Sequence, residues 1–154
     1  MLYADGKTVY AYDVVTGTNV AKDVLTIEEH VDTIAVDSNK GFVFVGYSGD
    51  DDIAYVDRYN FSVDDTVVSM PSLAVNATSI MNVYEGESVT ALAIDDDQRI
   101  LYVSNTEGSR IDSVEYDDHN HVATVGTPKG GIVDTLYESV HNIDKVTSLA
   151  VDYL

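Results

Sequence analysis

The chain has 154 residues, and its 27 acidic side chains against 8 basic ones give a formal net charge of −19 at pH 7. This excess of negative charge argues against binding to nucleic acids or anionic membrane surfaces, which both select basic surfaces. No apolar run in the sequence approaches the roughly 20 residues that span a bilayer, so we expect no membrane insertion. The chain contains no cysteine, which excludes disulfides and thiolate metal sites. Asp outnumbers Glu by 20 to 7, and this favours a turn-rich β protein because Asp side chains bond to local backbone groups.

The first expected strands lie near the N-terminus. Residues 2–5 and 9–13 are short runs of aliphatic and tyrosine side chains, which suit a pleated, half-buried surface. Residues 2–5 read like residues 101–104, and residues 9–13 read like the third strand of the unit that follows. The chain therefore begins within a unit that recurs later.

Residues 31–88 contain the first complete unit, in which short β runs alternate with turn residues. The expected strands cover residues 31–37, 42–46, 53–57 and 66–70. The second is almost wholly apolar, as in a strand buried on both faces, whereas the third alternates more clearly. Residues 71–88 form an insertion after the fourth strand, which fits either an extra strand or a short helix.

The opening segment of this unit occurs three times. Val31, Val89 and Val146 each begin a segment of the pattern Val-x-small-aliphatic-Ala-aliphatic-Asp, at spacings of 58 and 57 residues. The second copy continues with expected strands over residues 100–104, 111–115 and 121–125, where residues 111–115 align with 53–57. Its insertion covers residues 127–145, in which residues 132–137 fit either a strand or a short helix. Matches at one period predict a repeat architecture.

Residues 89–125 resemble the repeat of YVTN-type and YWTD-type β-propellers. In those families a strand ending in aliphatic-Ala-aliphatic-Asp is followed by a turn and a Leu-Tyr-Val-Ser-Asn-like strand, which residues 101–105 match. The resemblance implies an all-β fold of four-stranded antiparallel blades, in a six-bladed-propeller-like arrangement. It says far less about function than about fold.

The repeats divide residues 1–154, taken as a single propeller segment, into about three blades. Two are residues 31–88 and 89–145, and a composite blade joins residues 146–154 to residues 1–30. Three blades are too few for a closed ring, and exposed edge strands pair readily with other chains. Three arrangements stay open: a six-bladed ring of two copies, a head-to-tail polymer, or part of a longer propeller. The expected assembly edges contain Val146, Leu149, Val151, Leu2 and Tyr3.

Candidate metal ligands lie where the first strands end. Asp37 and Asn39 precede a glycine in a pattern that partly resembles a calcium loop, and Asp95 and Asp97 occupy the corresponding turn. Asp152 ends the third copy of the strand. The simpler interpretation is that these residues form turns, so we expect no cofactor, with calcium as the alternative.

Asn60 and Asn76 each begin an N-glycosylation sequon in the variable half of the first unit. Glycans at these positions would mean an exported protein, and we expect an extracellular or cell-surface location. The scarcity of Lys and the excess of Asp also suit the cytoplasm of a halophile, which is the alternative.

No P-loop, G-x-S-x-G or H-E-x-x-H motif occurs in the chain. We therefore expect a non-catalytic scaffold that binds itself or an adjacent propeller chain, in its sharper form a structural protein of a surface layer or filament. The alternative is an enzyme on the same fold, a metal-dependent hydrolase of the lactonase type. Its site at a central channel would use Asp37, Asp95 and Asp152.

Overall fold

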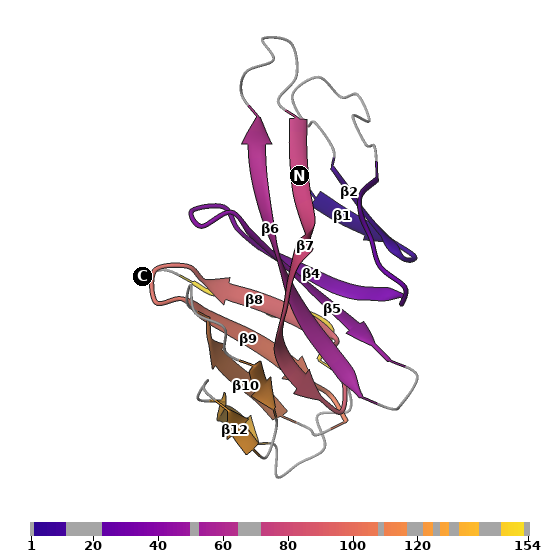
Figure 1. The fold of residues 1–154 in the computed structure, drawn as a ribbon. Coiled ribbons are helices and arrows are strands. Elements are labelled where there is room, and N and C mark those ends of the chain that lie inside the picture. The colour runs from indigo at the N-terminus through magenta and orange to yellow at the C-terminus, as the bar shows by residue number, and fades with distance from the viewer. Residues whose placement is uncertain are drawn as a thin grey trace.

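The computed structural model describes residues 2–11, 23–49, 53–64, 72–107, 110–116, 122–124, 127–129, 133–138 and 146–152. Every regular element in these residues is a β-strand, so the expected all-β class is confirmed (Figure 1). The described part of the chain holds no helix that is long and apolar enough to cross a membrane.

The strands form three sheets, which we name A, B and C. Sheet A has the order β1-β2-β3, sheet B the order β12-β11-β7-β6-β5-β4, and sheet C the order β13-β10-β9-β8. All strand pairs are antiparallel except β7 with β11. The strand bounds are β1 Leu2–Asp5, β2 Thr8–Ala11, β3 Asp23–Thr26, β4 Val31–Asp37, β5 Phe42–Ser48, β6 Ala54–Asp64, β7 Ser72–Gly86, β8 Ala91–Asp95, β9 Ile100–Asn105, β10 Arg110–Glu115, β11 Val122–Thr124, β12 Thr127–Lys129 and β13 Val133–Glu138.

Both complete units fold into antiparallel sheets whose first three strands follow each other in chain order. β4, β5 and β6 begin the first unit, and β8, β9 and β10 begin the second. β5 is buried from Phe42 to Gly46, as its unbroken apolar sequence predicts. A turn that contains Gly41 at φ 70° joins β4 to β5, a backbone conformation that glycine adopts without steric cost.

The fourth strand of each of these sheets lies in a stretch that the repeat treats as an insertion. In the first unit it is β7, which pairs with β6, and the predicted strand at residues 66–70 lies outside the described residues. In the second unit it is β13, which pairs with β10. The predicted fourth strand at residues 121–125 is wrong for this role, because β11 pairs with β7 and β12 instead. The six-residue run of β13 offers the edge of β10 a longer partner than β11 could.

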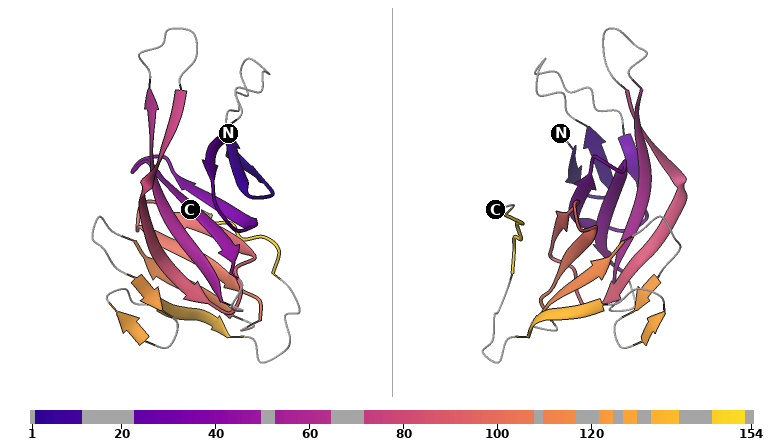
Figure 2. Two further views of the ribbon diagram at one scale, coloured as in Figure 1. Left: turned by 45° about the vertical axis from the view of Figure 1, so that its right-hand side comes forward. Right: turned by 90° about the vertical axis from the view of Figure 1, so that its left-hand side faces the viewer.

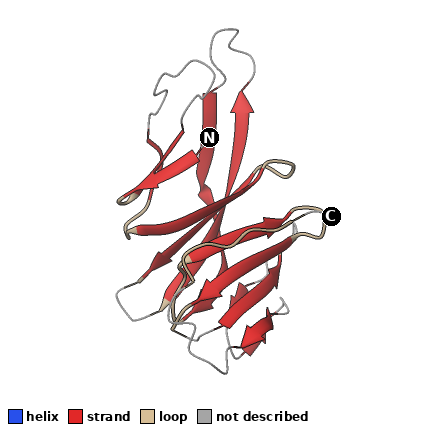
Figure 3. Ribbon diagram, turned by 180° about the vertical axis from the view of Figure 1, so that it is seen from behind, coloured by secondary structure: helices blue, strands red, loops and turns tan. Residues whose placement is uncertain are grey.

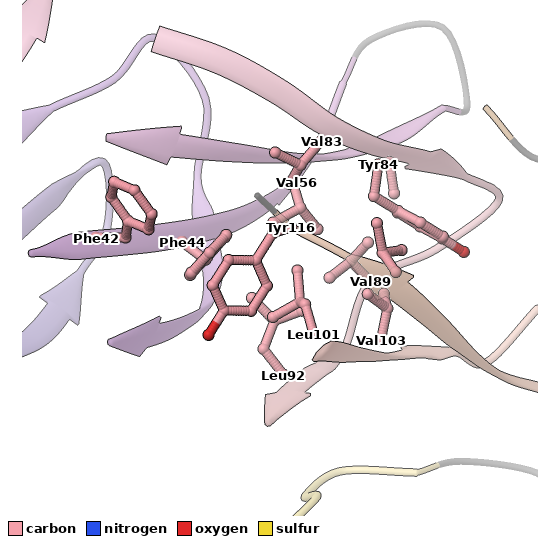
Figure 4. Packing of buried hydrophobic residues seen from close by; sticks show 12 residues of the cluster. Phe42, Phe44, Val56, Val83, Tyr84, Val89, Leu92, Leu101, Val103 and Tyr116 are labelled. Carbon is pink, nitrogen blue, oxygen red and sulfur yellow. The ribbon is translucent and has the colours of Figure 1, made fainter. Parts of the chain in front are cut away.

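Sheet B lies between sheets A and C, since alternate residues of β5 point to opposite faces. Val43 and Val45 belong to a core with Val9 and Leu25 of sheet A. Phe42 and Phe44 belong to a second core with sheet C (Figure 4), whose members on that side include Leu92, Leu101, Val103, Val114 and Tyr116. The first strands of neighbouring sheets also approach one another, because β4 contacts both β1 and β8. Successive units therefore stack face to face.

Two alignments inferred from the sequence shift once the strand registers are known. Val45 pairs with Asp57 and the equivalent Val103 pairs with Asp112, so Asp57 corresponds to Asp112 rather than to Glu115. The cause is a shorter loop between β9 and β10 than between β5 and β6.

The N-terminal alignment shifts by one residue. Leu2 and Ala4 pack toward sheet B, the following unit, whereas Leu101 and Val103 face the preceding one. A displacement of one residue reverses the faces of a strand. Leu2 therefore matches Tyr102, and Ala4 matches Ser104.

Candidate functional site

Asp37 and Asp95, the proposed metal ligands at the ends of β4 and β8, are occupied by hydrogen bonds. Asp37 is 1% exposed; its Oδ1 accepts a bond from the Lys40 amide at 2.9 Å and its Oδ2 one from the Tyr116 hydroxyl at 2.9 Å. Asp95 accepts bonds from the Gln98 amide at 2.9 Å and from Gln98 Nε2 at 2.8 Å. Both carboxylates cap the turn that follows their strand, which is the simpler interpretation of their recurrence.

The other candidate ligands lie on the surface. Asn39 Nδ2 donates to Asp96 Oδ2 at 2.5 Å, which places the two turns side by side. Asp97 and Asp152 are exposed. No group of three acidic or histidine side chains among the described residues could hold a metal ion. Of the three acids that the hydrolase alternative would use, Asp37 and Asp95 accept hydrogen bonds from turns, and Asp152 is exposed on the surface.

The two sequon asparagines lie opposite each other on neighbouring strands. Asn60 of β6 pairs with Asn76 of β7 in the strand register, and Asn60 is exposed. A glycan on Asn60 would project from the sheet B ribbon.

Two Tyr–Asp hydrogen bonds, one within sheet B and one between sheets B and C, were not identified from the sequence. Asp57 accepts bonds from the Tyr47 hydroxyl at 2.8 Å and from Asn82 Nδ2 at 3.3 Å. The equivalent Asp112 accepts bonds from the Tyr84 hydroxyl at 2.7 Å and from Arg110 Nε at 3.0 Å. Their equivalence could be found from the sequence only by allowing a three-residue difference in loop length.

The electrostatics of these pairs suit structural hydrogen bonding. Burial, followed by the Asp57 carboxylate, raises the pKa of Tyr47 far above its usual range, and the same causes raise the pKa of Tyr59 to about 12. Burial also raises the pKa of Asp57 against the opposing effect of its two hydrogen bonds. The tyrosines therefore stay protonated and act as donors to the carboxylates at neutral pH.

Residues 146–152 form no strand, in contrast to the prediction that they begin a blade. They run alongside sheet C, on the side away from β6 and β7 (Figures 2 and 3). Val146, Leu149 and Val151 are half-buried, while the residues between them are exposed. From Leu149 onward this is the alternation of a strand with one covered face.

Thr90 fixes the start of this segment. Its Oγ1 donates to the carbonyl oxygen of Val146 at 2.6 Å and also lies 2.7 Å from the Thr106 hydroxyl and 3.1 Å from the Ser104 hydroxyl. Asp32, which matches Thr90 in the repeat, accepts a bond from Ser48, which matches Thr106. The first unit therefore has a side-chain pair in the same place.

A small residue in the second strand receives the valine that opens the next unit. A Cβ placed on Gly46 would lie 2.6 Å from Cγ1 of Val89, so no larger side chain fits there. Ser104 matches Gly46, is fully buried, and lies beside the segment that Val146 begins. The start of residues 146–152 therefore lies on sheet C near the place that Val89 takes on sheet B.

In the part of the chain that the structure describes, sheet A has no counterpart of the strand that opens the other two units. Sheets B and C end at β4 and β8, the two strands with the repeated Val-x-x-aliphatic-Ala-aliphatic-Asp pattern, whereas sheet A ends at β1. Leu2 and Tyr3 lie in this edge strand, as predicted from the sequence. Among the described residues β1 pairs with β2 alone, which leaves its other edge available to a further strand.

No protein-family model matches the chain, and no curated protein sequence matches it. The function must therefore be argued from the arrangement of the sheets themselves.

Proposed function

We propose that the chain is a propeller-type scaffold that assembles with copies of itself, residues 146–152 of one copy completing sheet A of the next. One observation carries the proposal: among the described residues the third copy of the first-strand pattern pairs with no strand, and sheet A shows no strand that corresponds to β4 or β8. Added edge strands bind through main-chain hydrogen bonds and through pockets for alternate side chains. The donor strand and its acceptor edge occur in the same chain, so every copy can do both.

The donor segment is already arranged for pairing. Its apolar side chains Leu149 and Val151 are half-buried, while Ser148 and Ala150 are exposed. Because Thr90 fixes its start, pairing costs less conformational entropy than it would for a free tail. Pre-ordering of this kind favours association.

The acceptor side offers an exposed apolar residue as well as a free edge. Val36 of β4 points toward sheet A, since it pairs with Val43, and is 39% exposed. On the opposite face of β4, the first strand of sheet C already contacts that strand. A first strand added to sheet A would cover Val36 in the same way, and removal of its remaining exposed apolar area from water is favourable.

The register of the added strand follows from the two complete units. Ala35 pairs with Phe44 and Thr33 with Gly46, and Ala93 and Ala91 pair with the equivalent residues of β9. Because Leu2 matches Phe44 and Ala4 matches Gly46, Ala150 should pair with Leu2, and Ser148 with Ala4. These four side chains would then all face sheet B of the acceptor copy.

The same contact, in which residues 146–152 pair with β1 of another copy, can build two forms of assembly. Two copies that complete each other would supply six stacked sheets, within the four to eight blades of closed propellers. Copies that do not close would continue into a filament. With a formal charge of −19 on each copy, salt should strengthen the assembly by screening repulsion. An extracellular or cell-surface structural role, supported by the sequons, belongs to this proposal.

The test is the molar mass of the folded chain, measured by size-exclusion chromatography with light scattering. Ala150 is exposed in the single chain and would face the acceptor, so Ala150→Asp should give monomers. Thr147→Asp is the matched control, because the equivalent position carries Asp32 in the first unit. We expect dimers or larger species for the wild type and the control. A wild type that stays monomeric across its soluble concentration range would contradict the proposal.

A further inference from the structure

We propose a second contact between copies, in which the outer face of sheet A, centred on Tyr3 and Tyr10, stacks on the outer face of sheet C of the donor copy. The inference rests on the proposed function, because the donor segment already lies on sheet C. A strand of sheet A that pairs with this segment brings the rest of its sheet over sheet C. The partner is therefore a second copy of this chain, and the surface is a sheet face as well as a sheet edge.

The outer face of sheet A presents an aromatic pair. Tyr3 and Tyr10 are cross-strand partners whose rings stack at a centroid distance of 5.3 Å and an interplanar angle of 19°. Both are half-buried, although Leu2, Ala4 and Val9 of the same strands point the other way into the core with sheet B. The two rings therefore lie on the face of sheet A away from sheet B.

The outer face of sheet C carries half-buried apolar side chains. Ile100 and Tyr102 of β9 alternate with Leu101 and Val103, which face sheet B. Ile111 of β10 pairs with Ser104 and therefore shares the face of Ile100 and Tyr102. These three side chains remain partly exposed on this face of the single chain.

The equivalent positions of sheet B already form an interface between sheets. Phe42, Phe44 and Val56 match Ile100, Tyr102 and Ile111, and all three lie in the core that joins sheet B to sheet C (Figure 4). The side chains that they meet include Val103 of β9, which matches Tyr3 in the corrected alignment. The outer face of sheet C therefore corresponds to the face of sheet B that packs on sheet C. In the proposed assembly, sheet A of another copy packs on it in the same way.

The first strand of sheet C fits the same arrangement. Ala91 and Ala93 pair with Ser104 and Tyr102, so they lie on the outer face, and both are buried. Residues 146–152 run along this side of the sheet (Figure 3), and Tyr102, Ile100 and Ile111 of β9 and β10 belong to the same face. The donor segment and these residues therefore divide the outer face between strand pairing and sheet stacking.

Tyrosine nitration by tetranitromethane, mapped by mass spectrometry, tests the stacking apart from the strand pairing. Wild-type and Ala150→Asp chains are compared at one concentration, with the molar mass of each sample measured in parallel. Tyr10 lies in β2, one strand away from the paired edge, so pairing alone would not cover it. We expect Tyr10 to react in the monomeric variant and to be protected about fivefold or more in the assembled wild type. The buried Tyr84 should stay unreactive in both samples.

An assembled wild type in which Tyr10 reacts as fast as in the monomer would overturn the stacking and leave the strand pairing intact. A wild type that stays monomeric would overturn both. As a second measurement, Tyr10→Lys should raise the concentration at half-assembly about tenfold or more, while Tyr10→Phe should leave it nearly unchanged. Equal effects of the two substitutions would contradict the face-to-face contact.

Discussion

Tyr84→Phe should destabilise the fold by about 2–3 kcal/mol, because it removes one hydrogen-bond donor from a buried carboxylate. The Tyr84 side chain is fully buried, donates to Asp112 Oδ2 at 2.7 Å and accepts a bond from Asn105 Nδ2 at 3.1 Å. A hydrogen bond to a charged group contributes about 1.5–3 kcal/mol. The substitution also removes the hydroxyl oxygen that accepts the bond from Asn105 Nδ2, which adds to the cost. The packing of the aromatic ring is unchanged.

The assay is urea unfolding followed by far-UV circular dichroism at pH 7, with all variants in the Ala150→Asp background. This background keeps assembly from adding to the measured stability. Tyr102→Phe is the control and should change the free energy of unfolding by less than about 0.5 kcal/mol. In a double-mutant cycle, Tyr84→Phe should cost much less once Asp112→Asn is present. A cost below about 0.5 kcal/mol for Tyr84→Phe would refute the role given to this pair.

Three further predictions concern the turns, the sheet contacts and pH. Gly46→Val should cost about 1–3 kcal/mol in urea unfolding, because its side chain would overlap Val89; no loss would mean that the two sheets can separate at this point. Asp37→Asn should cost about 1–3 kcal/mol and Asp97→Asn less than about 0.5 kcal/mol, and equal effects would contradict the buried turn cap. Since the folded pKa of Tyr59 is raised to about 12 from 10.0, its contribution to stability is complete below pH 10 and is lost as the pH rises through 12. Tyrosinate absorbance and circular dichroism should therefore show late-titrating tyrosines that ionise together with unfolding; ionisation near pH 10 in the folded chain would contradict their burial.

The sequence predicts the first three strands of each unit well, because their signals are local. The expected strand at residues 42–46 lies within β5, and the expected strand at residues 31–37 coincides with β4. An unbroken apolar run and a turn that begins with a capping Asp are sufficient to specify both. The stacking of the units follows from the repeat, since no single unit can bury both faces of its sheet.

The pairing of the fourth strands could not be predicted from local patterns, although the strand alternative for residues 132–137 is confirmed by β13. Both β7 and β13 lie in stretches that the repeat comparison treats as insertions, and each is selected by the edge of the third strand that it meets. The choice of β13 over β11 depends on contacts between residues far apart in the chain. Strand propensity alone does not decide such a competition.

The residues of the proposed assembly site could be placed only in part from the sequence. Leu2 and Tyr3 lie in β1 at the edge of sheet A, but residues 146–152 form no strand, and none of the described strands pairs with them. The sequence alignment assigned each β1 residue to the opposite face of the strand, because a match of four residues does not fix the register to within one position. The role of Thr90 depends on a contact across 56 residues, and no local pattern indicates it.

Disulfide trapping between two single-cysteine chains tests the strand exchange most directly, and the natural chain contains no cysteine that would interfere. An Ala4→Cys chain is mixed with a Ser148→Cys chain under mild oxidation, and Tyr3→Cys replaces Ala4→Cys as the control on the opposite face. We expect a covalent heterodimer from the first mixture and little from the second, because paired cysteines must share a face at close Cβ separation. Equal yields from both mixtures, or no covalent heterodimer from the first, would contradict the proposed assembly.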